Sequence, residues 1–248
     1  VVSATKGSEP EVLVWNPYSF QVRQHFRKDF DSCIAALSFS RNDTWVAVVG
    51  GDDSQENVIV VYDYAQGTTV VKEQHAGKNR IIAIAFNPHM RTGELSFVTV
   101  GVRHVRFWSL LRGKLTGRKG SYDTRGGSES MLSVAFTDPE HVSAVKDITF
   151  TGSKDGRIFI WKDTKAVWNV QCCKGPIFCL LVHGATVVAG GKDTNAPVRE
   201  WKIGRGWPAR LELTPARGSD DQGLNLAQKT DGAPAGGRSA SSSACVRA

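Results

Sequence analysis

The sequence has little of what marks disulfide-stabilised, membrane-spanning or catalytic proteins. Its 248 residues include five cysteines, which form no C-x-x-C pair and no regular framework, so we expect free thiols in a reducing compartment. No apolar run approaches the roughly 18 residues of a membrane span, and no charged-then-apolar leader is present. No G-x-S-x-G, H-E-x-x-H or paired-carboxylate pattern occurs. These absences predict a cytoplasmic protein that is not an enzyme and does not bind membranes.

Ligand-binding motifs are missing as well. The six histidines lie without metal-ligand spacing, and GGDDSQEN at 50–57 lacks the alternating acids of an EF-hand loop. AGGKDT at 189–194 lacks both the upstream glycine and the hydroxyl residue of a phosphate loop. We therefore expect no metal, no cofactor and no small-molecule substrate.

The composition is that of a globular protein with a basic surface. Hydrophobic residues make up 41% of the chain and charged residues 22%, while the net charge is +7 with a pI near 9.3. A positive balance favours acidic partners such as nucleic acid, anionic surfaces or acidic proteins. The opening stretch, VVSAT, is already strand-like and has no initiator methionine, so we expect the sequence to begin inside a folded unit.

Internal repeats are the strongest signal in the chain. An alternating apolar run that ends in an aromatic residue recurs as EVLVW, NVIVVY, HVRFW, GRIFIW and PVREW. The aromatic anchors recur every 40 to 53 residues, at Trp15, Tyr62, Trp108, Trp161 and Trp201. Around each anchor lie further short runs rich in β-branched residues, separated by Gly, Asp, Asn and Pro, and convincing amphipathic helices are absent.

Four short strands at this period predict an all-β fold, a WD40-type β-propeller built from four-stranded antiparallel blades. A single blade has two apolar faces, so it is stable only when stacked between neighbours. Within a blade we expect the first strand to lie innermost and to be covered on both faces. The pair Asp155-Gly156 is a tight-turn signal between the second and third strands, so we assign it and Trp161 to the scaffold rather than to a chemical site.

The repeats resemble those of WD40 proteins, most clearly in TGSKDGRIFIWKD. The order of EVLVWNPYSFQVRQHF, GGDDSQENVIVVYDY, IIAIAFNPH and FVTVGVRHVRFWSL is similar to the first propeller of the echinoderm microtubule-associated protein-like family, from about Val1 to about Lys202. That resemblance implies a module for binding tubulin and microtubules. In the family two joined propellers make this contact and a coiled coil oligomerises the protein; neither the second propeller nor the coiled coil is found in this sequence.

The strand count predicts an incomplete propeller of about four to five blades. We expect three strands before Cys33, three sets of four, and three more that end near Ile203. The propeller is therefore assigned to 1–203. Residues 204–248 are rich in Gly, Ala, Ser, Pro and Arg and are predicted to be a disordered tail. An alternative is that Trp207, Leu211 and Leu213 dock on the last blade.

Basic residues concentrate in one blade. Between positions 91 and 125 there are eight basic residues and only two acidic ones, Glu94 and Asp123. The basic residues are Arg91, Arg103, Arg106, Arg112, Lys114, Arg118, Lys119 and Arg125. We interpret them as a candidate surface for an acidic protein partner such as tubulin, and the alternative is a solvated blade edge. Aromatic residues that would stack on bases are sparse, so nucleic acid is not expected.

Two functional hypotheses follow. The first is a non-enzymatic module that binds tubulin or microtubules and lies on the cytoskeleton in the cytoplasm. The second is a general WD40 scaffold for protein–protein interaction in a cytosolic or ciliary complex. The fold alone does not distinguish these two hypotheses, so they must be distinguished by the residues of the binding surface.

Overall fold

The structure is a computed structural model that describes residues 1–5, 7, 9–51, 56–90, 94–111, 113–122, 129–140, 147–192, 198–203 and 213–215. The chain divides into two compact units, Val1–Arg118 and Lys119–Ala248. All the regular secondary structure among the described residues is β-strand.

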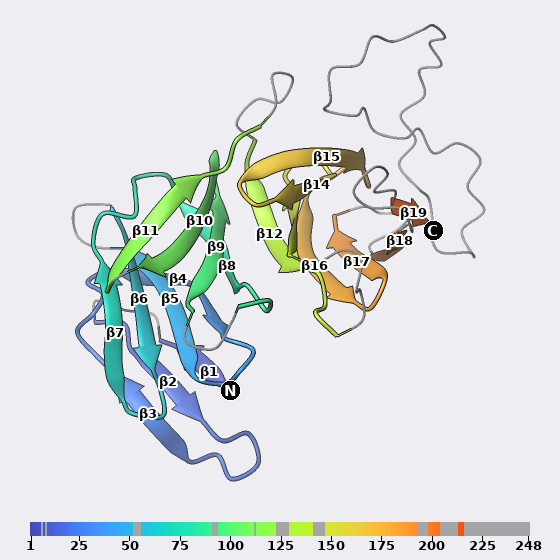
Figure 1. Cartoon of the computed structure of the whole chain (residues 1–248). Coiled ribbons are helices and arrows are strands. Elements are labelled where there is room, and N and C mark those ends of the chain that lie inside the picture. Colours follow the sequence, from blue (N-terminus) through green and yellow to red (C-terminus); the bar gives the residue numbers. More distant parts are fainter. Residues whose placement is uncertain are drawn as a thin grey trace, which may run out of the picture. The chain divides into compact units, whose positions relative to one another are not determined.

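The first unit contains three antiparallel sheets, whose strands lie side by side in Figure 1. The first sheet has three strands, β1 (Val2–Ala4), β2 (Val12–Trp15) and β3 (Val22–Phe26). The second has four, β4 (Cys33–Phe39), β5 (Trp45–Gly51), β6 (Asn57–Asp63) and β7 (Thr68–Glu73). The third also has four, β8 (Ile81–Phe86), β9 (Ser96–Gly101), β10 (His104–Leu111) and β11 (Lys114–Lys119).

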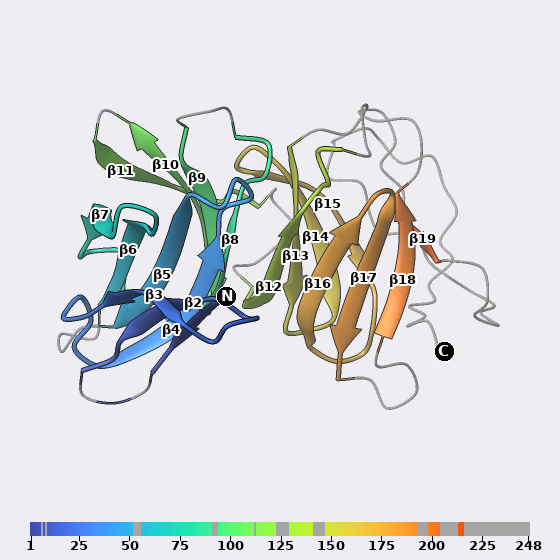
Figure 2. The same ribbon diagram turned by 90° about the horizontal axis from the view of Figure 1, so that it is seen from below.

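The second unit contains two four-stranded sheets, which Figure 2 shows with their strands in chain order. One is formed by β12 (Met131–Phe136), β13 (Ile148–Ser153), β14 (Arg157–Lys162) and β15 (Lys165–Gln171). The other is formed by β16 (Ile177–His183), β17 (Thr186–Gly191), β18 (Val198–Ile203) and β19 (Leu213–Pro215). Five sheets of consecutive antiparallel strands confirm the predicted all-β propeller blades, and the three-stranded first sheet agrees with an incomplete set.

Alternating burial explains why the central strands are apolar along their whole length. In β5 the side chains of Val46 and Val48 pack with the first sheet, and those of Ala47 and Val49 pack with the third. Because successive residues of a strand point to opposite faces, both faces of the second sheet are core. The two sheets of the second unit also pack through such side chains, since Ile160 of β14 and Val187 of β17 belong to one apolar cluster.

The first strands of the second and last sheets are less buried than predicted. β5 and β13 are almost entirely buried, whereas the edge strand β4 has no buried residue and β16 has one, Ile177. The sequence led us to expect full cover on both faces because these strands are rich in apolar and small residues. Each is instead an edge strand with a hydrogen-bonded neighbour on one side only, so part of its surface stays open.

The last sheet also differs from the expected strand count. β19 pairs with β18, with Ile203 opposite Leu213 and Trp201 opposite Pro215. This strand lies within the segment 204–248 that was predicted to be a disordered tail, so propeller strands extend beyond the predicted boundary at Ile203. Leu213, one of the residues considered above for docking on the last blade, lies in β19. Trp207, Leu211 and the rest of that segment lie outside the described residues.

The aromatic anchors occupy equivalent positions in the five sheets. Trp15, Tyr62, Trp108, Trp161 and Trp201 lie in β2, β6, β10, β14 and β18, next to the second strand of each complete sheet. In two sheets the indole N–H donates to a threonine of that second strand, from Trp108 to Thr99 at 2.8 Å and from Trp161 to Thr151 at 2.9 Å. Trp15 makes the same kind of bond to Ser3, at 3.2 Å.

The other two anchors have no hydroxyl at the corresponding place. Tyr62 lies opposite Val46, and the residue two positions further along β5 is Val48; Trp201 lies opposite Val187, and the corresponding residue is Ala189. Their polar groups reach outside the sheet instead. The Tyr62 hydroxyl donates to Asp29 at 2.7 Å, and the Trp201 indole N–H donates to the thiol of Cys172 at 3.1 Å. Each of the five anchors, four of them buried and Trp15 half-buried, therefore has its polar group satisfied.

Candidate partner-binding surface

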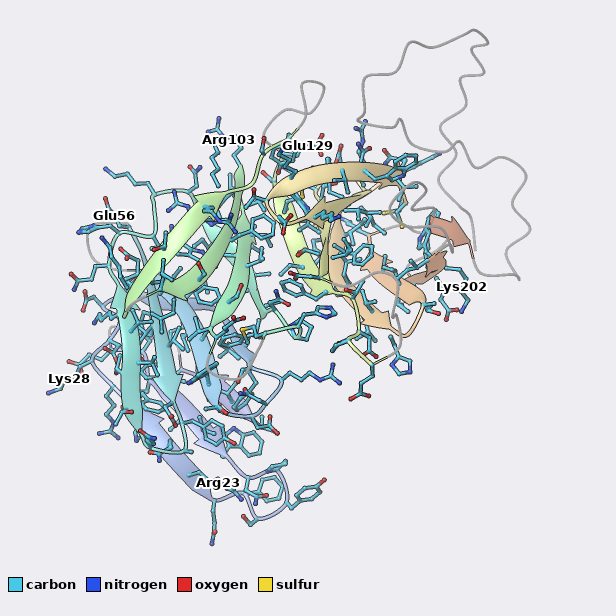
Figure 3. The ribbon with its side chains drawn as sticks, in the orientation of Figure 1. Arg23, Lys28, Glu56, Arg103, Glu129 and Lys202 are labelled. Carbon is cyan, nitrogen blue, oxygen red and sulfur yellow. The ribbon has the colours of Figure 1, made fainter. Side chains whose placement is uncertain are left out.

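Arg103 lies at the tip of the turn that joins β9 to β10. Its φ is +48°, a left-handed backbone conformation, and its side chain is exposed. Figure 3 shows it pointing away from the ends of these two strands. The turn is held in place because Val102 N–H donates to the carbonyl of Arg80 at 2.9 Å. Arg103 therefore presents a cation from a fixed backbone.

The segment before β8 brings two more cations to this end of the third sheet. Lys78 and Arg80 are exposed and directly precede β8, whose first residue, Ile81, pairs with Gly101 at the start of the Arg103 turn. Asn79, between them, donates from its side-chain amide to the carbonyl of Arg103 at 3.4 Å. We call Lys78, Arg80 and Arg103 the Arg103 cluster.

Asn57 fixes the backbone of this cluster. Its side-chain amide donates to the carbonyls of Gly77 and, at 2.9 Å, Asn79. The nearest acid with a recorded contact is Glu56, which lies 2.7 Å from the ring nitrogen of His75 and 4.0 Å from the ammonium of Lys78. Among the described residues, Arg80 and Arg103 have no ion pair. Among the described residues the three cations of the cluster thus outnumber the one acid recorded beside them.

Of the basic residues singled out from the sequence, Arg118 and Lys119 lie at the same end of the third sheet as Arg103. β10 ends at Leu111 and its neighbour β11 begins at Lys114, so the end of β11 lies beside the start of β10. Both side chains are exposed. Lys114, at the start of β11, lies at the opposite end of this hairpin. The structure thus brings Arg103, Arg118 and Lys119 to one end and separates Lys114 from them.

Arg106 has a structural contact within the sheet. Its guanidinium carbon lies 5.2 Å from the centroid of the buried Trp108 ring, and its side chain is half-buried. β11 passes over this pair at Gly117, where a Cβ atom would lie 2.6 Å from the Trp108 ring and 2.7 Å from Arg106 Cδ. Only glycine fits there without displacement, so Arg106 covers the core more than it faces a partner. Arg91, Arg112 and Arg125 lie outside the described residues.

His104, beside Arg106, is buried and hydrogen-bonded. Its Nε2 lies 2.8 Å from Thr99 Oγ1, the oxygen that also accepts the indole N–H of Trp108. Burial, with a smaller effect from the Arg106 charge, lowers the pKa of His104 to about 4. The ring is therefore neutral at physiological pH and hydrogen-bonded to the Thr99 hydroxyl, so it belongs to the core of the blade rather than to its charged surface.

The turn at Asp155 and Gly156 joins β13 to β14 in the second unit. Gly156 has φ +87°, and a Cβ atom there would lie 1.9 Å from the carbonyl oxygen of Cys173. Asp155 accepts a hydrogen bond from Ser153 and lies 3.4 Å from the Arg157 guanidinium. The recorded contacts of this turn are to its own sheet, to the segment after β15 and to Glu129.

Glu129 also lies near this turn. Burial, together with the charge of Asp155, raises the pKa of Glu129 to about 6. Figure 3 places Glu129 just before β12.

Among the described residues there is no group of three or more His, Cys, Asp or Glu that would hold a metal ion. No helix in this part of the chain is both long and apolar enough to span a bilayer.

Lys78 and Arg80 were missed in the sequence because the search for charge was confined to one run, 91 to 125. The signal was present in the order of the strands. The linker into the first strand of a blade and the turn between its second and third strands lie at the same end of the sheet, since the first two strands are antiparallel neighbours. Lys78-Asn79-Arg80 should thus have been grouped with Arg103.

The sheets described above define the class of the protein, a β-propeller. It is similar to the β-propeller domain of Cps50 (Swd1) from Myceliophteria thermophila, with a TM-score of 0.67 and 12% sequence identity over 86% of this chain and 67% of that one. It is also similar to the computationally designed Ika8 protein, with a TM-score of 0.54 and 21% identity over 83% of this chain and 56% of that one. At these identities the likeness concerns the fold alone.

The family is narrower than the class. Residues 2–213 match the model of the echinoderm microtubule-associated protein first β-propeller, and the chain belongs to that family. It is 26% identical over 193 residues to the 77 kDa echinoderm microtubule-associated protein of Strongylocentrotus purpuratus, an alignment that covers 75% of this chain and 26% of that protein. It is 27% identical over 190 residues to human echinoderm microtubule-associated protein-like 1, covering 74% of this chain and 22% of that protein. The chain thus spans about a quarter of the length of these relatives.

Proposed function

We propose that this chain is a non-enzymatic module that binds tubulin or microtubules on the cytoskeleton of the cytoplasm. Its membership of a microtubule-associated propeller family supports the class of partner. The observation that carries the proposal in this chain is the Arg103 cluster, three exposed cations held on one end of the third sheet by backbone hydrogen bonds.

The physical basis is electrostatic attraction to an acidic protein surface. Exposed cations on a fixed backbone raise the rate of encounter with such a surface, and salt screens the attraction within about 10 Å at 0.1 M. Arg118 and Lys119 at the same end add to the positive field. Lys114 is at the other end and contributes less to a partner bound over the Arg103 cluster.

Co-sedimentation with stabilised microtubules at low and at near-physiological salt tests the proposal. We expect the wild-type chain to pellet at low salt and to pellet less as salt is raised. Arg103→Glu should weaken binding by about three- to tenfold and reduce the salt dependence. Lys114→Glu is the matched control, because it reverses one charge at the opposite end of the same hairpin.

The control should bind nearly as the wild type does. Absence of pelleting by the wild-type chain at low salt would refute the proposal. Equal losses in the two variants would show that net charge, rather than the Arg103 cluster, governs binding. A wild type that fails to pellet but purifies with one stoichiometric partner would favour the general WD40 scaffold instead.

A further inference from the structure

The loop between β2 and β3 exposes aromatic side chains that no sheet covers. Tyr18 is 92% exposed, Phe20 is 76% exposed, and Val22, at the start of β3, is 55% exposed. Large aromatic side chains at such exposure are uncommon on soluble surfaces, and they are enriched where proteins bind one another. Figure 1 shows the loop extending past the ends of its two strands. We call residues 16–22 the aromatic hairpin tip.

The corresponding loops of other sheets are different. β6 is joined to β7 through Tyr64-Ala65-Gln66-Gly67, and β14 is joined to β15 through Asp163-Thr164. The only aromatic residue in these two loops, Tyr64, is half-buried and packs edge-on against Phe39 at 5.5 Å. A simple strand connection therefore needs no exposed aromatics, and the first sheet departs from the two sheets whose equivalent connections the structure describes in full.

Hydrogen bonds hold the tip in one conformation. The side-chain oxygen of Asn16 accepts from the backbone N–H groups of Tyr18 at 2.9 Å and Ser19 at 3.3 Å. The backbone carbonyl of Asn16 accepts from Phe20 N–H, and its N–H donates to the carbonyl of Gln21, both at 2.9 Å. A loop that is ordered before it binds loses little conformational entropy on binding.

Phe20 adopts a backbone conformation that phenylalanine disfavours. Its φ is +56°, in the left-handed region where glycine and asparagine are the usual residues. The ring stacks on Trp15 with centroids 6.1 Å apart and planes 20° apart, yet most of its surface still faces water. Strain at an exposed aromatic residue is not explained by the packing of the sheet.

The charge around the tip indicates the chemistry of the partner. Residues 16–24 contain one cation, Arg23, and no acid. Figure 3 shows Arg23 pointing away from β3. Aromatic anchors beside an arginine fit an apolar recess bordered by carboxylates.

From these observations we infer that the aromatic hairpin tip is a second contact with the acidic partner, in which Tyr18 and Phe20 enter an apolar recess of that protein. Under the proposed function, on which this inference rests, the recess lies on tubulin. The β2–β3 connection corresponds to the β10–β11 connection, so the tip lies at the Lys114 end of its sheet, opposite to the end that carries the Arg103 cluster. The partner must therefore extend along the sheets from one end to the other, with the Arg103 cluster governing encounter and its salt dependence and the tip governing how long the complex lasts.

The test uses Tyr18→Ser and Phe20→Asn, separately and together, in microtubule co-sedimentation and in dissociation kinetics. Asparagine is chosen because it tolerates the left-handed φ, so the loop keeps its conformation. Leu111→Ser is the matched control, since Leu111 is a single apolar side chain, 64% exposed, at the end of β10 in the third sheet rather than the first. Far-ultraviolet circular dichroism and melting temperature should match the wild type for all variants.

We expect the double variant to bind about tenfold more weakly or worse, through faster dissociation, with the salt dependence unchanged. Leu111→Ser should bind as the wild type does. If the wild type pellets and the double variant pellets equally well, the inference is refuted while the proposed function stands. If the wild type does not pellet, the proposed function fails and the inference fails with it.

Binding of the tip to either of two other partners would also overturn the inference. A second copy of this chain would appear in sedimentation velocity as a concentration-dependent dimer that the double variant abolishes. An anionic membrane would appear as flotation of the wild type, but not of the double variant, with phosphatidylserine vesicles.

Discussion

The indole N–H of Trp108 donates a hydrogen bond to Thr99 Oγ1 across 2.8 Å, and both side chains are buried. The same oxygen lies 2.8 Å from the ring nitrogen of His104, so one hydroxyl joins three residues of two strands. The hydroxyl oxygen accepts the indole N–H, and the tautomer of the neutral imidazole sets the direction of the bond between Thr99 and His104.

Thr99→Val should destabilise the first unit by about 2–4 kcal/mol, because it keeps the shape of the side chain and leaves two buried polar groups without a partner. Urea denaturation monitored by tryptophan fluorescence measures the change. Thr116→Val, at an exposed position of β11, is the control and should shift the free energy of unfolding by less than about 0.5 kcal/mol. Equal effects of the two substitutions would contradict the assigned network.

Acid should weaken the same blade through His104. Its pKa is lowered to about 4 in the folded state, from an ordinary value of 6.5, so the unfolded chain binds more protons between these pH values. Stability then falls as the pH drops from 6.5 toward 4, by up to about 3 kcal/mol from this residue. Urea midpoints at pH 7 and pH 4.5 for the wild type and His104→Gln measure it.

We expect the acid sensitivity of the wild type to exceed that of His104→Gln. Comparing the two proteins removes the opposite contribution of Glu129, whose raised pKa makes the folded state the better proton binder between pH 4.5 and 6. Identical pH profiles would show that His104 is not held neutral by the fold.

Two glycines with similar backbone conformations should respond very differently to alanine. Gly156 has φ +87° and would place its Cβ atom 1.9 Å from a backbone oxygen, whereas Gly113 has φ +75° with nothing within 4 Å. Gly113→Ala should cost about 1 kcal/mol from left-handed strain alone, and Gly156→Ala at least about 3 kcal/mol because the backbone must also move. Thermal unfolding of both variants measures the difference, and similar losses would refute the close approach.

The last sheet should promote self-association of this chain when it is expressed alone. Leu181 and Val198 are 62% and 59% exposed, on the face of β16 and β18 opposite the core residue Trp201. Exposed apolar sheet surface favours association, so Leu181→Thr with Val198→Thr should lower light scattering at equal concentration. Glu200→Gln on the same face is the control, and unchanged scattering in the double variant would contradict the prediction.

The sequence was sufficient to predict the blades because the pattern is repeated. Trp15, Tyr62, Trp108, Trp161 and Trp201 mark one position in five sheets, and the strands around them alternate as burial on two faces requires. Even the hydrogen bonds of the anchors follow a rule that can be read in the sequence. A threonine stands at the required place in FVTVG and TFTGS, whereas valine and alanine stand there in VAVVG and VVAGG.

Other features depend on neighbours that a single strand does not reveal. The partial exposure of β4 and β16 follows from their place at the edge of a sheet, which their apolar composition conceals. The pairing of β19 with β18 was hidden by the polar, glycine-rich residues around it. The Arg103 cluster joins residues from two loops, so a search for runs of charge separates Lys78 from Arg103.

The apolar clusters of the first unit share no residue. One lies between the first and second sheets and the other between the second and third, and even and odd positions of β5 and β6 are divided between them. Each seam can therefore vary in sequence without its neighbour having to adjust. A lineage built in this way can accumulate differences blade by blade, which suits a chain whose relatives keep the architecture while only about a quarter of their aligned residues remain the same.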